Sequence, residues 1–201
     1  MEKLSKLKNS QIFLKNIDFD NFRNSRHWVG YFKAENINDL HLINESTMLL
    51  INFFKENLTN FFLLSALTEN PDYESYGGLN NFDILYDKLF TEIKSLKVIQ
   101  EYNDDFKNYF ENDEKLNIKL INIHFDIDIS TKICELLMFY YFNRIWGQVC
   151  FLINPVLGIA LYPHEDIGYG CISLNGDKDL LIGFLKFCNE KEYFISYFDE
   201  V

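Results

Sequence analysis

The sequence predicts an α/β fold, with α+β as the alternative, in a single domain over residues 1–201 with a central mixed or antiparallel sheet. First, 201 residues with a hydrophobic fraction of 48 % are enough for one sizeable core. Second, segments with helical apolar periodicity are interspersed with short apolar or alternating segments. Third, the segments of the C-terminal half follow in the order β-α-β-β-β-α.

A helix is predicted in the N-terminal half, within the run NESTMLLINFFKENL. Ser46 is a residue type that caps helix N-termini, and Met48, Leu49 and Phe53 recur near the helical period. We expect this helix to end near Asn57.

A buried strand, a long loop and a second helix follow. Residues 60–67 are short, aromatic and apolar, which favours the strand. The run ENPDYESYGGLNN after it contains a proline and a glycine pair, so it is predicted to be a loop and a candidate for a functional excursion. Residues 81–96 predict an amphipathic helix that lies on a core. Its apolar stripe consists of Phe82, Leu85, Leu89 and Ile93.

Residues 101–115 combine acidic and aromatic side chains. The acids are Glu101, Asp104, Asp105, Glu111, Asp113 and Glu114, and the aromatic residues include Phe106, Tyr109 and Phe110. The rings predict an anchored side and the acids a solvated side. Two interpretations stay open: a solvated helix or loop, or an acidic recognition patch that the rings hold in place.

The C-terminal half begins with an alternating pattern. From residue 117 to Ile129, apolar and polar residues alternate, which predicts a strand with one solvated face. Ser130 is expected to end this strand and to cap a helix over 131–146 that is apolar around most of its circumference. Such a helix can cross over the sheet in the usual right-handed sense.

Three strands and a last helix complete the predicted order. The strands cover 148–154, 158–162 and 170–174, and the segment NPVLG between the first two suits a tight hairpin. The first strand is apolar at nearly every position, so we expect it in the centre of the sheet. Asp177 is expected to cap a helix over 178–188.

The charge of the chain is strongly negative and unevenly distributed. The total is −11, and residues 1–33 form a basic N-terminal segment with seven bases against three acids. That segment carries +4, which leaves −15 for the rest of the chain. A protein that mainly coats nucleic acid needs a basic surface, so that class is disfavoured. Two interpretations remain: the acidity keeps the protein soluble, or an acidic face binds a basic partner.

The sequence also predicts a cytoplasmic protein. The N-terminal segment lacks the apolar core and cleavage site of a secretory signal, and the longest apolar run, 136–142, is too short to span a membrane. The four cysteines contain no C-x-x-C pair and lie in apolar surroundings, which favours buried, reduced thiols. They are Cys134, Cys150, Cys171 and Cys188.

No sequence motif predicts a cofactor, a metal or a catalytic centre. The phosphate-binding loops, the nucleophile elbow and the H-E-x-x-H pattern are absent. One constellation remains, LYPHEDIGYG at residues 161–170. In an extended segment His164 and Asp166 project to the same face, where they can orient a base or hold one edge of a metal site. We favour a polar loop between two buried strands, as Gly168 and Gly170 suggest.

The C-terminal half has the sequence VCFLINPVLGIALYPHEDIGYGCISLNGDKDLLIGFLKFC. It contains an apolar strand ending in Ile-Asn-Pro, a second strand that starts with glycine, an acidic and aromatic turn, a third strand and a closing helix. Over residues 118–190 this resembles small bacterial immunity proteins, in particular those against ribonuclease toxins of contact-dependent growth inhibition systems. It is also similar to a domain family of unknown function with a Tyr-Asp-Asp-Arg-Gly turn, but Ile167 stands where the arginine would be.

The resemblance implies a cytosolic inhibitor without enzymatic activity. It would bind one cognate toxin domain, a basic nuclease, and block its active or substrate-binding surface. The acidic body agrees with this, because complementary charge steers association. We expect a monomer or weak dimer without direct contact to nucleic acid or membrane. The predicted contact residues are Asp104, Asp105, Glu111, Asp113 and Glu114, with Glu165 and Asp166 as a second acidic cluster and Tyr162 and Tyr169 as aromatic anchors.

Two alternative functions compete with the inhibitor. One is a small enzyme or metal-binding protein that uses His164 and Asp166. The other is a structural subunit of a larger assembly, which would need an exposed apolar patch.

Overall fold

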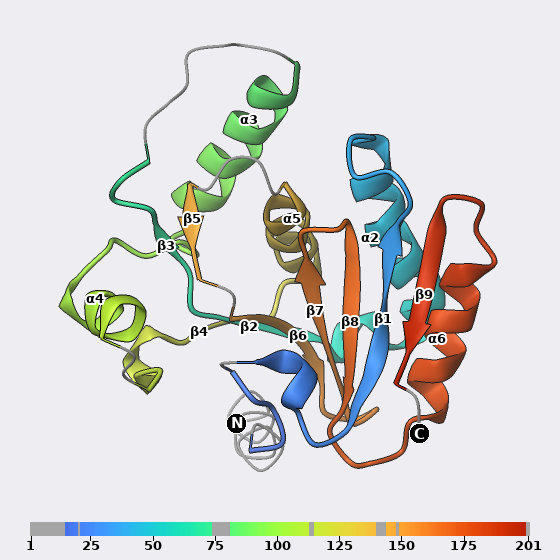
Figure 1. The fold of residues 1–201 in the computed structure, drawn as a ribbon. Coiled ribbons are helices and arrows are strands. Elements are labelled where there is room, and N and C mark those ends of the chain that lie inside the picture. The colour runs from blue at the N-terminus through green and yellow to red at the C-terminus, as the bar shows by residue number, and fades with distance from the viewer. Residues whose placement is uncertain are drawn as a thin grey trace.

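The computed structural model describes residues 15–19, 21–73, 81–112, 115–139, 144–147 and 149–199. Within these ranges helices and strands form a mixed α/β structure, which confirms the predicted fold class (Figure 1). The helices are α2 (His41–Phe54), α3 (Asn81–Ser95), α4 (Asp104–Glu111), α5 (Ile127–Met138) and α6 (Asp179–Asn189), with short 3-10 helices η1 (Phe22–Asn24), η2 (Lys55–Asn60) and η3 (Ile118–Leu120). The strands are β1 (Trp28–Ala34), β2 (Phe62–Ser65), β3 (Thr68–Glu69), β4 (Asn122–His124), β5 (Ile145–Trp146), β6 (Cys150–Asn154), β7 (Ile159–His164), β8 (Gly168–Ser173) and β9 (Phe194–Phe198).

Seven strands form the main sheet, in the order β4-β2-β6-β7-β8-β1-β9. Each neighbouring pair is antiparallel, which decides between the mixed and antiparallel sheets that the sequence allowed. The predicted hairpin between β6 and β7 depends on Asn154, whose side-chain oxygen accepts hydrogen bonds from the backbone N–H groups of Val156 and Leu157 at 3.1 Å. β3 and β5 form a small second sheet beside the main one (Figure 1).

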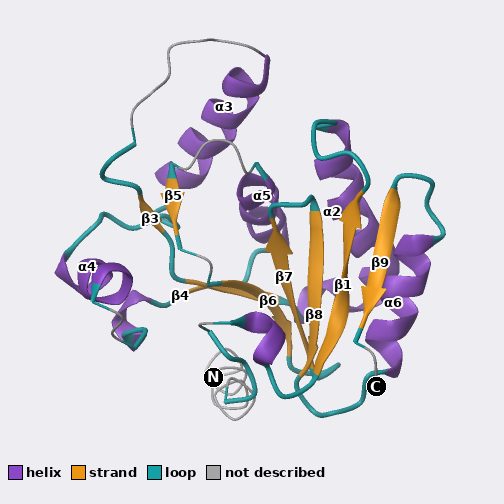
Figure 2. Ribbon diagram, in the orientation of Figure 1, coloured by secondary structure: helices purple, strands orange, loops and turns teal. Residues whose placement is uncertain are grey.

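The two faces of the main sheet are covered differently (Figure 2). Helices α2, α5 and α6 pack on one side, which we call the covered face. Its core includes Phe32, Phe184 and Tyr169, each with no exposed side-chain surface. The opposite side, the open face, carries a second cluster that includes Trp28 and Tyr162 and is partly covered by the segment before β1 and by α4.

The first predicted helix begins earlier than expected. α2 starts at His41, whose backbone N–H donates a 3.1 Å hydrogen bond to the Asp39 carboxylate. Ser46, the predicted cap, is fully buried inside the helix. The predicted helix start at Ser46 was wrong because Leu42 and Ile43 already belong to the buried stripe of the helix. The polar pair at 44 and 45 interrupts the apolar pattern in the sequence and hid this earlier start.

The predicted helix over 81–96 is confirmed as α3, but its buried stripe is rotated from the predicted one. Leu85 is 48 % exposed, whereas Tyr86, Phe90 and Ile93 are buried against the core. The long loop predicted before this helix lies in part outside the described residues, since 74–80 are not described. Thr68 and Glu69, just after the predicted strand, form β3.

Within the alternating stretch from 117 to 129, only the three residues of β4 form a strand. The stretch also contains η3 and the first residues of α5. Asp126, not Ser130, caps the following helix, because its carboxylate accepts hydrogen bonds from the backbone N–H groups of Asp128 and Ile129 at 2.9 and 3.2 Å. At its other end α5 stops at Met138, and Ile145 and Trp146, predicted to be helical, lie in β5. These residues are extended because β3 offers their backbone groups hydrogen-bonding partners.

The last strands are longer and more numerous than predicted. β7 continues to His164 and β8 begins at Gly168, so the predicted polar loop is only a three-residue turn. β1 and β9, which follow β8 in the sheet, were not predicted. The four cysteines are buried and unbridged, as predicted.

Candidate functional site

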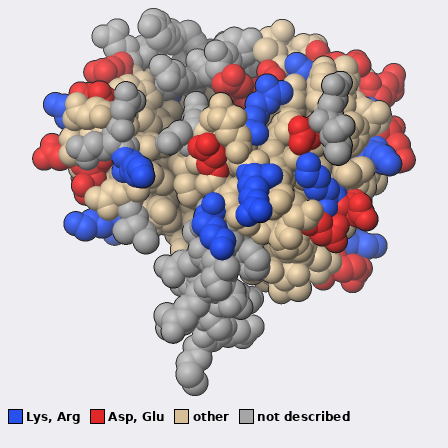
Figure 3. Space-filling view, turned by 60° about the horizontal axis from the view of Figure 1, so that its bottom comes forward, with Lys and Arg blue, Asp and Glu red and all other residues tan. Residues whose placement is uncertain are grey.

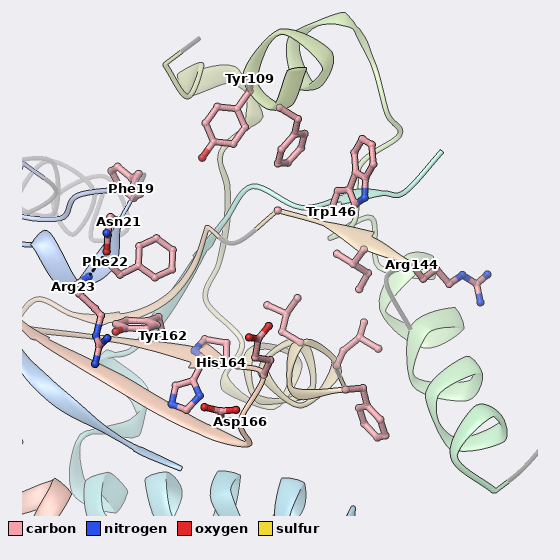
Figure 4. Close-up of a pocket in the computed structure, with 18 of the residues that line it drawn as sticks. Phe19, Asn21, Phe22, Arg23, Tyr109, Arg144, Trp146, Tyr162, His164 and Asp166 are labelled. Atoms are coloured by element: carbon pink, nitrogen blue, oxygen red, sulfur yellow. Dashed lines mark hydrogen bonds between the residues drawn. The ribbon is translucent and has the colours of Figure 1, made fainter. Parts of the chain in front are cut away.

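A groove of about 1320 Å³ opens on the open face of the sheet (Figure 4). Residues 162–166 form its floor, Phe19 and residues 21–23 form one wall, and α4 with β5 form the opposite wall, while residues of α3 and α5 complete the lining. Its side chains are those of Phe19, Asn21, Phe22, Arg23, Tyr31, Tyr86, Tyr109, Phe110, Glu111, Lys115, Leu136, Leu137, Phe139, Arg144, Ile145, Trp146, Tyr162, Pro163, His164, Glu165 and Asp166, with the backbone of Gly147. Nine of these 22 residues are Phe, Tyr or Trp, against 17 % in the whole chain, so the groove is enriched in aromatic rings.

The floor is built around the β7–β8 hairpin, in which Tyr162 pairs with Gly170 and His164 pairs with Gly168. The Tyr162 ring lies over its glycine: a β-carbon on Gly170 would come within 1.9 Å of Cζ of Tyr162, so only glycine leaves room for this ring. An aromatic ring placed over a glycine of the next strand fixes the register and covers the backbone. Gly168 has a different role, because a β-carbon there would come within 1.9 Å of the Phe32 carbonyl oxygen of β1.

The imidazole of His164 is held by the backbone of β1. Its Nε2 lies 2.9 Å from the carbonyl oxygen of Phe32, which can only accept, so Nε2 carries the proton and donates. Burial lowers the pKa of His164 to about 4, despite the opposing effects of Asp166 and of the hydrogen bond to Phe32. A neutral imidazole with this pKa is a poor general base near pH 7. The geometry thus disfavours His164 as the base of a reaction centre.

The turn after β7 carries the two acids of the floor. Ile167 ends it with φ of +57°, a left-handed conformation that is rare for a β-branched residue, and its side chain is buried in the core of the covered face. Asp166 lies 3.7 Å from the ammonium group of Lys33. Glu165 is exposed and makes no hydrogen bond or ion pair with any residue that the structure describes. Burial and the neighbouring Asp166 raise the pKa of Glu165.

The wall opposite the N-terminal segment is an aromatic cluster of α4 and β5. Asn103 caps α4 by accepting a 3.1 Å hydrogen bond from the backbone N–H of Phe106, and the Phe106 ring is fully buried. The Phe110 ring packs edge-on to Trp146 with 5.6 Å between ring centres, and Tyr109 lies 5.0 Å from Phe110. Of the three rings predicted to anchor this segment, one is buried and two face the groove.

The segment before β1 forms the other wall. The Phe22 ring packs 4.8 Å from that of Tyr162, whose hydroxyl accepts a 2.9 Å hydrogen bond from Nε1 of Trp28. The guanidinium of Arg23 lies 5.3 Å from the ring of Trp28 and 5.5 Å from that of Tyr31. Arg23 is therefore placed over aromatic rings at the edge of the groove (Figure 4).

At another part of the groove Arg144 lies among acids and a ring. Its guanidinium donates a 2.7 Å hydrogen bond to Asp87, lies 3.7 Å from the Glu69 carboxylate, and lies 3.7 Å from the centre of the Phe90 ring. Its charge is matched within the protein, whereas Glu165 has no ion-pair partner among the described residues.

Four of the nine predicted contact residues line this one groove: Glu111 from α4 and Tyr162, Glu165 and Asp166 from the hairpin. The fold thus brings part of the two acidic clusters together. Asp104 and Asp105 lie in the first turn of α4, outside the groove, and Asp105 accepts a 3.1 Å hydrogen bond from the Asn117 amide. Asp113 and Glu114 lie outside the described residues.

Tyr169 corrects the prediction, because it is not a surface anchor in this structure. Its side chain is fully buried on the covered face, with its ring 6.0 Å from that of Phe32. Successive residues of a strand point to opposite faces, so Tyr169 faces the helices while its neighbour Gly170 lies under the Tyr162 ring of the groove. Its buried hydroxyl makes no hydrogen bond of ordinary geometry within the described residues.

The sequence did not indicate most of the aromatic walls. Phe19, Phe22 and Arg23 lie in a segment that was interpreted only by its charge, and Trp146 was assigned to a helix. No local pattern signals them, because Trp28 to Ala34 does not alternate apolar and polar residues, and the place of the preceding segment beside the open face depends on the strand order.

Charge on the protein surface is not uniform. Figure 3 shows Lys and Arg side chains gathered near the middle of one view and acids mainly toward its margins. Among the described residues before β1, the exposed cations are Lys15, Arg23 and Arg26. The basic character predicted for residues 1–33 therefore persists on the surface of the described part.

Searches of the described residues for metal ligands and comparisons with known proteins identify no further function for the groove. Among the described residues, no three His, Cys, Asp or Glu side chains come together as a metal site requires. No helix of the described part has the length and apolarity to cross a membrane. No protein family model, curated protein or solved structure matches this chain significantly.

Proposed function

We propose that this chain is an immunity protein that binds a cognate toxin domain in the groove and so neutralises it. The groove supports this proposal, because residues from two predicted contact regions, on α4 and on the β7–β8 hairpin, line it together. Its richness in Tyr, Trp and Arg is typical of the central residues of protein interfaces.

The position of the groove also fits a surface that binds a partner protein better than it fits the active site of an enzyme. Its floor is a hairpin within the main sheet, and nine of its 22 lining residues are aromatic. His164 is committed to the Phe32 carbonyl, which weighs against the alternative of an enzyme that uses His164 and Asp166. The net charge of −11 favours a basic partner such as a nuclease domain, through steering of the encounter.

The first test is the neighbourhood of the gene. The proposal predicts a gene for a large secreted toxin directly upstream, whose C-terminal domain is then the partner to produce. Co-expression should yield a complex and should protect cells from that domain. A toxin domain that neither binds this chain nor is neutralised by it would contradict the proposal.

The second test is charge reversal within the groove. Replacing Glu111 and Glu165 together by lysine should weaken binding of the toxin domain by about tenfold or more and flatten its salt dependence. The matched control is the double replacement of Glu56 and Glu190 by lysine, since both are exposed, change the net charge equally and lie outside the groove. Equal effects of the two pairs would mean that the groove is not the contact surface.

A structural subunit remains the second candidate, because β9 at one edge of the sheet exposes aromatic residues. Tyr197 and Phe198 are 41 % and 42 % exposed. The edge is partly closed, since the backbone N–H of Ser196 donates a 3.0 Å hydrogen bond to the Asn189 side chain. Sedimentation of the purified chain distinguishes the candidates: stable self-association supports a subunit, whereas a monomer or weak dimer agrees with the inhibitor.

A further inference from the structure

The two strands that link the main sheet to the small sheet differ in length by one residue. Ser65 pairs with Cys150 in the main sheet, and Thr68 pairs with Trp146 in the small sheet. Two residues separate Ser65 from Thr68, whereas three separate Trp146 from Cys150. Strands that keep pairing across such a mismatch form a β-bulge, which bends the longer strand and re-aims its side chains.

Gly147 is a residue of this bulge whose conformation requires glycine. Its φ is +119°, which L side chains rarely adopt, and a β-carbon there would come within 2.4 Å of the Ala66 carbonyl oxygen. Ala66 and Leu67 are buried, and the backbone N–H of Ala66 donates a 2.8 Å hydrogen bond to the carbonyl oxygen of Val149. A side chain at Gly147 would therefore have to push the two strands apart.

The residue before Gly147 supports the wall of the groove that α4 and β5 form. The Trp146 ring packs edge-on against both Tyr102 and Phe110, with 5.6 Å between ring centres in each pair (Figure 4). The Tyr102 hydroxyl donates a 2.8 Å hydrogen bond to Glu111, one of the predicted contact acids. Because these contacts join α4 to β5, the direction of β5 after the bend also places the side chains of α4 along the groove.

The floor of the groove lies on the other side of the bulge. The β7–β8 hairpin is part of the main sheet, in which β7 pairs with β6, whereas β5 pairs with β3 in the small sheet. From the bulge, β6 thus leads to the floor and β5 to the wall. The two contact regions of the proposed interface meet at the bend that contains Gly147.

We infer that Gly147 is a positioning residue of the groove, because the bend at this glycine sets where the Trp146 wall stands relative to the floor. Gly147 has no side chain to offer a partner, so it acts through Trp146. The inference rests on the proposed function for the presence of a partner, whose surface must match the groove. The position of the wall itself is a property of the chain alone.

The test measures the position of the wall in the free protein. The chain has two tryptophans, Trp146 at the wall and Trp28, which donates its hydrogen bond to Tyr162 at the floor. Incorporation of 5-fluorotryptophan gives two ¹⁹F signals, which a Trp146→Phe variant assigns. In Gly147→Ala the Trp146 signal should shift while the Trp28 signal stays in place. Affinity for the toxin domain should fall about tenfold, since the displaced wall no longer matches its partner.

A second strained glycine provides the matched control. Gly158, in the turn between β6 and β7, has a φ of +67°, and a β-carbon there would come within 2.5 Å of the Asn175 amide nitrogen. This glycine does not line the groove. Gly158→Ala should lower the melting temperature, as Gly147→Ala does, but should leave the Trp146 signal and the affinity for the toxin domain unchanged. The control separates a loss of stability from a displaced wall.

A second variant keeps the test decisive if Gly147→Ala does not fold. Trp146→Leu leaves the bulge glycine in place and removes the ring contacts to Tyr102 and Phe110. The amides of α4 should then lose protection against hydrogen exchange, whereas the amides of β7 and β8 should keep theirs. Unaltered protection of α4 would overturn the inference, because Trp146 would then not hold the wall.

The outcomes separate this inference from the proposed function. If the Trp146 signal stays in place in Gly147→Ala, the inference is wrong even when a toxin domain binds. If the signal shifts and the upstream toxin domain does not bind the wild-type chain, Gly147 still positions the wall and the immunity function falls. If the toxin domain binds Gly147→Ala as tightly as the wild type despite the shift, the groove is not its contact surface. A shift together with weakened binding supports both.

Discussion

The two faces of the main sheet use aromatic residues in opposite ways. Tyr169 and Tyr162 occupy neighbouring strands, and both are almost completely buried. On the covered face the Tyr169 hydroxyl lies among helices and makes no hydrogen bond of ordinary geometry within the described residues, whereas on the open face the Tyr162 hydroxyl accepts a hydrogen bond from Trp28 at the floor of a groove. The covered face is an apolar core that stabilises the fold. On the open face, hydrogen bonds such as that between Trp28 and Tyr162 hold polar atoms at the floor of the groove.

The largest difference between the faces should appear on removal of a ring. Phe184 on the covered face is fully buried and lies 5.6 Å from Phe32 between ring centres. Phe184→Ala should lower the free energy of unfolding by about 3–5 kcal/mol, since it leaves a cavity. Tyr31→Ala removes a half-buried ring stacked on Tyr197 and should cost only about 1 kcal/mol. Urea unfolding followed by circular dichroism measures the free energy of unfolding of both variants. Equal losses of stability would contradict the expected difference between the two faces.

Acid should act on the open face through His164. The pKa of His164 in the folded protein is about 4, below the ordinary value of 6.5. Between pH 6.5 and pH 4 the imidazole is therefore protonated in the unfolded chain and neutral in the folded chain. The contribution of His164 to stability is therefore complete above pH 6.5 and falls until about pH 4, by at most about 3 kcal/mol. The slope of unfolding free energy against pH should flatten in His164→Gln. It should persist in His41→Gln, which changes an exposed histidine of α2.

Filling the glycine below Tyr162 should have an intermediate effect. Gly170→Ala places a methyl group into the Tyr162 ring and should cost about 1–3 kcal/mol. In a Tyr162→Ala background the same change should be nearly neutral, so the double variant should lose about 1–3 kcal/mol less than the sum of the two single variants. Gly183→Ala is the control, because its nearest neighbour would be at 3.8 Å. A cost for Gly170→Ala that is the same in both backgrounds would show that the ring is not responsible.

The smallest effect separates the two tyrosine hydroxyls. Tyr162→Phe leaves Nε1 of Trp28 without its buried acceptor and should cost about 1 kcal/mol. Tyr169→Phe removes a buried hydroxyl that makes no hydrogen bond of ordinary geometry within the described residues, and should be neutral or slightly stabilising. The difference between the two midpoints of urea unfolding checks this, and a larger cost for Tyr169→Phe would reverse the comparison.

The sequence predicts the covered face better than the open one. α3, α6 and β6 follow directly from apolar periodicity, because each buries a continuous stripe or run. The hairpin was misjudged, since His164 and Glu165 look like loop residues until the pairing with Gly168 is known. The groove was beyond prediction for the same reason: it joins Phe22, Trp146 and Tyr162, and their proximity depends on strand order, which local patterns do not contain.

The packing of Tyr162 on Gly170 has a consequence for descent. A side chain at Gly170 is disfavoured while the Tyr162 ring is present, and loss of the ring exposes the backbone of its glycine. The two positions should therefore change together along a lineage. A side chain at Gly168 would instead meet the backbone oxygen of Phe32, so this glycine should be retained whichever residue stands at position 164.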